Sequence, residues 1–144
     1  MKPPIPHPEP GEAESPYKSV GGLRRVLNAL RYSVSGLALA WRVESAFRQE
    51  LALALVLVPV ALLLPVSVLE RLGLIGSTLL VLMIELLNSS VEAAIDRISL
   101  DHHRLSGRAK DFGSAAVFIA LVFCLLSWVL IAGPILVLAL ERLL

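Results

Sequence analysis

The chain has 144 residues, enough for one domain, and 56% of them are hydrophobic. A mean hydropathy of +0.77 is too high for an ordinary soluble domain and indicates a membrane protein. The formal charge of +1 gives no reason to expect a nucleic-acid partner. The single cysteine, Cys124, excludes an intrachain disulfide and a zinc site built from cysteines.

The first segment, residues 1–17, is rich in proline and glutamate. A segment of this composition cannot bury a hydrophobic core, so we expect a disordered tail. The segment also lacks the apolar stretch of a secretory signal peptide. The remaining residues, 18–144, are then expected to form one membrane domain.

Residues 20–42 have the pattern of an amphipathic helix, with apolar residues at helical spacing and arginines between them. We expect this helix to lie on the inner surface of the membrane with its apolar face in lipid. A surface helix of a soluble domain is the alternative, but the chain offers no soluble core to receive that face. The apolar positions are Leu23, Val26, Leu27, Leu30, Val34, Leu37 and Trp41.

Three apolar segments follow, and each is close to the ~20 residues that a helix needs to cross a bilayer. Pro59 could kink the first of these helices, and Pro65 could end it early. The very short link at Glu70 and Arg71 predicts that the first two spans form an antiparallel hairpin. The predicted transmembrane helices cover residues 50–69, 72–98 and 112–140.

Basic residues are distributed unevenly around these spans. Seven lysines and arginines precede the first span, and four lie at the end of the second span and before the third, namely Arg97, Arg104, Arg108 and Lys110. The short link holds only Arg71 and the C-terminal tail only Arg142. The positive-inside rule therefore places the N-terminus and the segment between the last two spans in the cytoplasm. The C-terminus then faces outward, as an odd number of spans requires.

The second predicted span carries a stripe of polar residues. Glu85 lies near the end of an apolar run, where a carboxylate is expensive in hydrocarbon and therefore suggests a function. At about 100° per residue, Asn88, Glu92 and Asp96 share the face of Glu85. The sequence thus predicts a line of acids that runs from inside the bilayer to its surface.

The stripe and the flanking segments Arg42–Glu50 and Asp101–Asp111 bring carboxylates, amides, imidazoles and cations to one interface. This mixture suits an anionic substrate held through a divalent metal such as Mg²⁺. Glu85 and Glu92 are separated by about 10 Å along a helix, too far to ligate one ion together. We therefore expect Glu92 to bind metal and nucleotide, and the deeper Glu85 to act as a general base that Asn88 orients by hydrogen bonding.

Structural roles are the alternatives for these residues. Glu85 could pair with a basic residue of a neighbouring helix, and Glu92 and Asp96 could cap a helix in solvent. His102 and His103 could be exposed loop residues. The chain has no Walker A spacing, Rossmann glycine pattern or HExxH motif.

Three blocks of sequence resemble the prokaryotic integral-membrane diacylglycerol kinase family. They are Glu85–Ile98, Ser106–Ala116, and Ala46–Glu50 preceded by Glu44. The similarity extends over residues 23–132, and long blocks in the family's order make it specific.

The resemblance implies an all-α membrane protein with three transmembrane helices and an N-terminal amphipathic surface helix, assembled as a homotrimeric bundle. Its active sites are shared between neighbouring subunits, in the bacterial inner (cytoplasmic) membrane. The implied activity is transfer of the ATP γ-phosphate to the hydroxyl of diacylglycerol, which gives phosphatidic acid, with Mg²⁺ as cofactor.

The resemblance also implies roles for individual residues. Glu85 is the implied base, Asn88 supports the catalytic centre, and Glu44 with Glu92 holds the metal. The implied nucleotide-binding residues are Arg25, Tyr32, Glu44, Glu92, Asp101, His102, His103, Lys110 and Asp111. The implied substrate-binding residues are Arg25, Ser33, Trp41, Phe47, Arg48, Gln49, Glu50, Glu85 and Ser114.

Two other functions are compatible with these residues. One is an undecaprenol kinase of the same family, although the blocks Ala46–Glu50 and Ser106–Lys110 look more like the diacylglycerol branch. The other is a non-enzymatic membrane subunit, for example a component of a proton path. That function does not explain why Arg108, Lys110 and the additional carboxylates gather on the cytoplasmic side.

Overall fold

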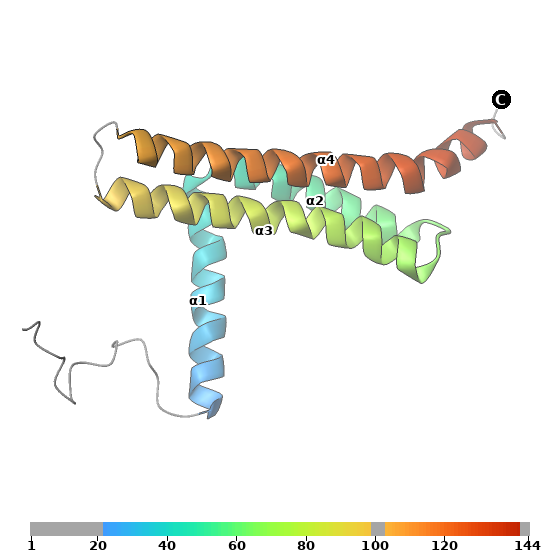
Figure 1. The fold of residues 1–144 in the computed structure, drawn as a ribbon. Coiled ribbons are helices and arrows are strands. Elements are labelled where there is room, and N and C mark those ends of the chain that lie inside the picture. Colours follow the sequence, from blue (N-terminus) through green and yellow to red (C-terminus); the bar gives the residue numbers. More distant parts are fainter. Residues whose placement is uncertain (1–21, 99–102, 142–144) are drawn as a thin grey trace, which may run out of the picture. The chain divides into compact units, whose positions relative to one another are not determined.

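The structure is a computed structural model that describes residues 22–98 and 103–141. Over these residues the backbone is helical with no strand, which confirms the all-α fold class. The predicted tail, residues 1–17, lies outside the described residues. The helices are α1 (Gly22–Val43), α2 (Ser45–Leu63), α3 (Val68–Ile98) and α4 (Arg104–Glu141) (Figure 1).

Three of these helices, α2, α3 and α4, are long and apolar enough to cross a membrane. This confirms the predicted number of spans. The assembly into a homotrimer and the position of α1 on the membrane surface remain predictions.

The ends of α2 differ from the predicted span, residues 50–69. This helix begins at Ser45, because the polar residues before the apolar run are compatible with a helix even though they do not suit lipid. It ends at Leu63, because Leu64 precedes Pro65 and adopts extended angles, φ −65° and ψ 140°. Pro59 remains inside the helix.

The other two spans also extend beyond their predicted starts. Helix α3 begins at Val68 rather than at residue 72, and α4 begins at Arg104 rather than at residue 112. Most of Asp101–Asp111, which lies between the second and third predicted spans, is therefore the first part of α4. The C-terminal part of α4 bends (Figure 1), and Pro134 in this part removes a backbone donor from the helix.

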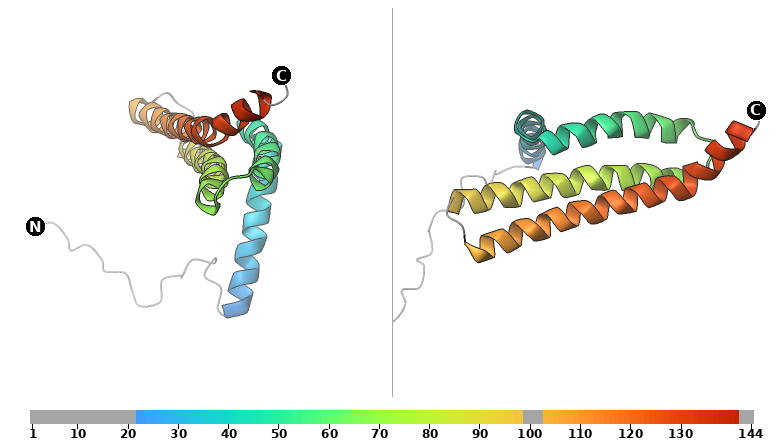
Figure 2. Two further views of the ribbon diagram at one scale, coloured as in Figure 1. Left: turned by 90° about the vertical axis from the view of Figure 1, so that its right-hand side faces the viewer. Right: turned by 90° about the horizontal axis from the view of Figure 1, so that it is seen from above.

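The chain divides into two compact units, Met1–Ala38 and Leu39–Leu144. In the first unit, the described residues belong to α1 and expose apolar side chains such as Leu23, Leu27 and Leu30. In the second unit, α3 packs against both α2 and α4 (Figure 2).

Small side chains form much of the interior of the second unit. Ala54 and Ala61 of α2 and Ala120 and Cys124 of α4 are all buried. Small residues let helices approach closely in a membrane, where burial of apolar surface alone does not drive association. Most large apolar side chains of the described residues are exposed, as expected where lipid or another subunit covers them.

A polar contact joins α3 to α4 within this interior. The Trp128 indole Nε1 donates a hydrogen bond to Thr78 Oγ1 at 3.1 Å, and Thr78 Oγ1 donates to the Leu74 carbonyl at 2.8 Å. Trp128 also packs against the buried cluster of Val81, Ala120 and Cys124. Thr78 Oγ1 also lies 3.8 Å from Cys124 Sγ, so this hydroxyl contacts two residues of α4 and fixes one helix against the other.

The predicted hairpin between α2 and α3 is closed by Arg71. Its guanidinium donates from Nε to the Ala61 carbonyl at 3.2 Å and from Nη2 to the Leu64 carbonyl at 3.0 Å. These carbonyls lie at the C-terminal end of α2, where the last carbonyl groups of a helix have no N–H partner within the helix. Ser67 and Glu70 cap the start of α3, because Ser67 N–H donates to Glu70 Oε2 at 2.8 Å.

We expect Arg71→Met to destabilise the folded protein by about 1.5–3 kcal/mol, because the carbonyls at the end of α2 lose a charged donor. Unfolding by SDS, followed by circular dichroism, measures the change. Arg97→Met is the control, since Arg97 is an exposed arginine at the opposite end of α3. Equal stability of the two variants would contradict a structural role for Arg71.

Candidate active site

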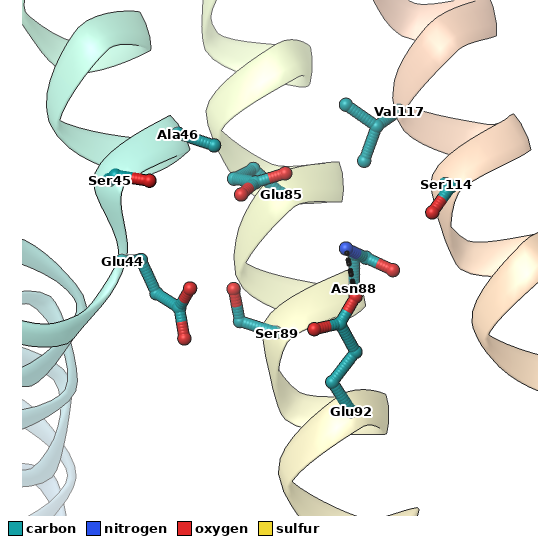
Figure 3. Close-up of a pocket in the computed structure, with 9 residues that line it drawn as sticks. All are labelled: Glu44, Ser45, Ala46, Glu85, Asn88, Ser89, Glu92, Ser114 and Val117. Carbon is teal, nitrogen blue, oxygen red and sulfur yellow. Dashed lines mark hydrogen bonds between the residues drawn. The ribbon is translucent and has the colours of Figure 1, made fainter.

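Helices α2, α3 and α4 line a cavity of about 290 Å³ in the second unit. It lies near the start of α2, where the C-terminal half of α3 passes the first turns of α4 (Figure 3). The lining residues are Glu44, Ser45, Ala46, Glu85, Asn88, Ser89, Glu92, Ser114 and Val117.

The polar stripe of α3 supplies the acidic wall of this cavity. Glu85, Asn88 and Glu92 recur at intervals of three and four residues, so the helix turns all of them to one side. Glu85 is only 5% exposed. Figure 3 shows its carboxylate between Ala46 of α2 and Val117 of α4, at the end of the cavity that lies deeper in the spans.

Asn88 is hydrogen-bonded differently from our expectation. Its Nδ2 donates to Glu92 Oε1 at 3.1 Å, one helical turn toward the C-terminus of α3 (Figure 3). In this structure the amide of Asn88 thus contacts Glu92 and not Glu85, and the expected role of orienting Glu85 remains a prediction. Pairs four residues apart are neighbours on a helix surface, and this pairing directs the amide toward Glu92.

Glu44, which directly precedes α2, and Glu92 of α3 lie at the same end of the cavity (Figure 3). Within residues 22–98 and 103–141, no three His, Cys, Asp or Glu side chains form a group that could hold a metal ion alone. Mg²⁺ does not need such a group, because it usually takes one or two carboxylates together with phosphate oxygens and waters. The donors present therefore fit Mg²⁺ that arrives with a nucleotide.

Lys110 forms an ion pair across helices. Its Nζ lies 2.7 Å from Asp96 Oδ1, which ties the first turns of α4 to the last turns of α3. Both side chains remain partly exposed. The pair keeps a cation on the side of the bundle where Glu44 and Glu92 lie.

The model of the family described as prokaryotic diacylglycerol kinase matches residues 31–132 of this chain. That match covers more than half of the chain. The chain belongs to the prokaryotic diacylglycerol kinase family. Together with the three apolar helices, this membership identifies a membrane protein.

Proteins named diacylglycerol kinase are similar to this member over most of their length. The Pseudomonas aeruginosa protein is 53% identical over 114 residues, which are 79% of this chain and 93% of that protein. The Escherichia coli K12 protein is 48% identical over 107 residues, or 74% and 88% of the two chains. The Haemophilus influenzae protein is 47% identical over 112 residues, or 78% and 94%.

The start of α2 carries several of the residues that the family resemblance implies for the lipid site. Arg48 Nη1 donates to the Trp41 carbonyl at 3.2 Å and to the Arg42 carbonyl at 3.3 Å, and so connects the end of α1 to α2. Phe47 is 1% exposed and acts as a packing residue in this structure. Glu50 Oε2 is buried without a hydrogen-bond partner among the described residues. Gln49 is exposed.

Other implied residues of this diacylglycerol kinase family member are not among the residues that line the cavity. Arg25, Tyr32 and Ser33 belong to α1 in the first unit, where Ser33 Oγ donates to the Ala29 carbonyl at 3.0 Å. Asp111 is exposed on α4. Their nucleotide and lipid contacts remain predictions.

Of the three consecutive residues Asp101, His102 and His103, which the resemblance implies for nucleotide binding, the structure describes only the last. Asp101 and His102 lie outside the described residues. His103 Nδ1 accepts a hydrogen bond from the Leu105 N–H at 3.2 Å, so its imidazole caps the start of α4. In this structure His103 has a structural contact, and its contact with nucleotide remains a prediction.

Four residues that line the cavity were not predicted from the sequence: Ser45, Ala46, Ser89 and Val117. Periodicity could have indicated Ser89, which follows Glu85 by four residues, and Val117, which follows Ser114 by three. Ser45 and Ala46 directly follow Glu44. Which side of α2 and α4 faces α3 depends on packing between distant segments, and the sequence pattern does not contain that information.

Proposed function

We propose that the protein is a lipid kinase that transfers the γ-phosphate of ATP to the hydroxyl of diacylglycerol and yields phosphatidic acid and ADP. Membership of the family and the names of its relatives support this activity. The observation that carries the proposal is the buried carboxylate of Glu85, which opens onto a cavity that Glu44 and Glu92 share.

We assign the role of general base in this reaction to Glu85, which the buried position of its carboxylate at the cavity supports. Its carboxylate accepts the proton of the lipid hydroxyl as that oxygen forms a bond to the γ-phosphorus. The bond between the γ-phosphorus and the bridging oxygen of the β-phosphate breaks, and ADP leaves. Glu85 lies at the end of the cavity that is deeper in the spans (Figure 3), so a lipid could present its hydroxyl there without leaving the bilayer.

The other end of the cavity suits the triphosphate. Glu44 and Glu92 would hold Mg²⁺, and the Asn88 amide restricts the orientation of Glu92. Bound Mg²⁺ neutralises the charge on the phosphate oxygens, on which phosphoryl transfer depends more than on covalent chemistry. Lys110 supplies a further positive charge, which Asp96 holds near the nucleotide end.

The size of the cavity supports an assembly with shared sites. Its volume of about 290 Å³ lies at the lower limit of the roughly 300–1,000 Å³ typical of ligand pockets, although the reaction needs space for two substrates. We therefore infer that a neighbouring copy of the chain completes the site, as in a homotrimer. The distribution of basic residues supports a location in the bacterial inner membrane with the N-terminus in the cytoplasm.

Purified protein in lipid bilayers, offered diacylglycerol and undecaprenol with radiolabelled ATP and Mg²⁺, is expected to label diacylglycerol strongly in preference to the polyprenol. Extraction of the lipids and chromatography measure the two products. Stronger labelling of undecaprenol would assign the protein to the polyprenol branch of the family. Labelling of neither lipid would refute the kinase function and favour a non-enzymatic membrane subunit.

A further inference from the structure

Gly113 of α4 lies directly against the amide of Asn88. A Cβ atom on Gly113 would overlap Asn88 Oδ1 and lie 3.2 Å from Asn88 Cγ, and its three nearest neighbours all belong to the Asn88 side chain. Real Cβ atoms do not approach other atoms so closely. The amide of Asn88 therefore occupies the volume that any other residue at position 113 would fill.

Only one of the two polar atoms of the Asn88 amide has a hydrogen-bond partner among the described residues. Nδ2 donates to Glu92 Oε1, whereas Oδ1 is buried and has no hydrogen-bond partner among the described residues. Rotation of the amide by half a turn would place Oδ1 against the Glu92 carboxylate, where two acceptors repel. The bond to Glu92 thus requires Oδ1 to point at α4, and Gly113 is the residue that leaves room for it.

We propose that Gly113 is a positioning residue of the phosphoryl-transfer site, which acts through Asn88 on Glu92. Because Gly113 has no side chain, the Asn88 amide can lie against α4 and donate its hydrogen bond to Glu92. This hydrogen bond fixes the Glu92 carboxylate, which lies at the metal and nucleotide end of the cavity. The inference rests on the proposed function, because it gives Glu92 a role in binding Mg²⁺ with ATP.

The chemistry of helices supports a specific need for glycine at this position. Glycine destabilises the interior of a helix relative to alanine, so its presence in α4 needs another reason. A methyl group at Gly113 would meet the end of a side chain and not the backbone of α3. Asn88 can rotate away from that methyl group, and the helices can stay packed, but the hydrogen bond to Glu92 is then lost. The predicted defect is therefore in the site rather than in the fold.

The test compares Gly113→Ala with Gly107→Ala, because a Cβ on Gly107 of the same helix meets nothing within 4 Å. Two quantities are measured on the full chain: the Mg²⁺ concentration for half-maximal lipid phosphorylation, and the binding of Mn²⁺ with a non-hydrolysable ATP analogue, followed by electron paramagnetic resonance. Loss of a group that orients a metal ligand typically weakens metal binding by about tenfold or more. We expect a shift of this size for Gly113→Ala and none for Gly107→Ala.

A double-mutant cycle with Asn88→Ala separates this mechanism from a general effect of packing. If Gly113 acts only through the Asn88 amide, Gly113→Ala causes no further change in Mn²⁺ binding once that amide has been removed. A change that adds in full to the effect of Asn88→Ala would overturn the proposal. Wild-type Mn²⁺ binding in Gly113→Ala alone would overturn it as well.

The cycle also covers the possibility that Gly113→Ala does not fold. In that case Asn88→Ala must restore folding to the double variant, because the methyl group then has nothing to meet. A double variant that still fails to fold would contradict the proposed contact. Wild-type protein that binds Mn²⁺ with the nucleotide analogue but phosphorylates no lipid would refute the proposed function, and Mn²⁺ binding would still decide the role of Gly113.

Discussion

Glu85→Gln should reduce the turnover of lipid phosphorylation by about 10²- to 10⁴-fold, the contribution typical of a general base. Glutamine has nearly the same shape as glutamate, so it fills the same buried position between α2 and α4, but it cannot accept the proton of the lipid hydroxyl. The measurement is the maximal rate at saturating ATP, Mg²⁺ and diacylglycerol. Circular dichroism and size-exclusion chromatography establish that the variant remains folded and assembled.

Glu141→Gln provides the matched control, because it makes the same chemical change on an exposed residue at the end of α4. This variant should keep the wild-type rate. If Glu85→Gln also kept that rate, another group would have to take the proton. If Glu85→Gln unfolded the protein, its carboxylate would instead have the structural role that the sequence left open.

Glu92→Gln should raise the Mg²⁺ concentration for half-maximal activity by at least about tenfold. Loss of a group that only hydrogen-bonds to a metal ligand already weakens metal binding by about tenfold, and loss of the ligand itself should weaken it at least as much. A glutamine oxygen can still accept the hydrogen bond from Asn88 Nδ2, so the substitution removes charge and leaves the local contact available. Excess Mg²⁺ should restore much of the maximal rate. An unchanged Mg²⁺ titration would exclude Glu92 as a ligand, and Glu141→Gln again serves as the control.

The elements that could be predicted from the sequence are those that depend on local geometry. Glu85, Asn88 and Glu92 share one helix, and the period of that helix is enough to place them on one face. Pro65 likewise ends α2 for a local reason, because it restricts the residue before it. The apolar runs identified three spans, although polar residues at their ends extend the helices beyond the lipid-compatible stretch.

The remaining features depend on contacts between segments that are distant in the sequence. The hydrogen-bond partner of Asn88 is one example, because Glu85 and Glu92 both lie about one helical turn from it and only Glu92 accepts its hydrogen bond. The closeness of Gly113 in α4 decides where the amide oxygen points, and no pattern within α3 contains that information. The ion pair of Lys110 with Asp96 is another example, because it joins two helices across the α3–α4 connection.

The contact of Trp128 with Thr78 gives the molecule an intrinsic optical probe. The chain has two tryptophans, and Trp41 is exposed whereas the Trp128 indole is hydrogen-bonded between α3 and α4. Tryptophan emission responds to the polarity around the ring, so the emission of a Trp41→Phe variant would come from Trp128 alone and report on this helix contact. Asn88 and Gly113 belong to the same two helices, and such a variant would therefore reveal whether their spacing changes when ATP and lipid arrive.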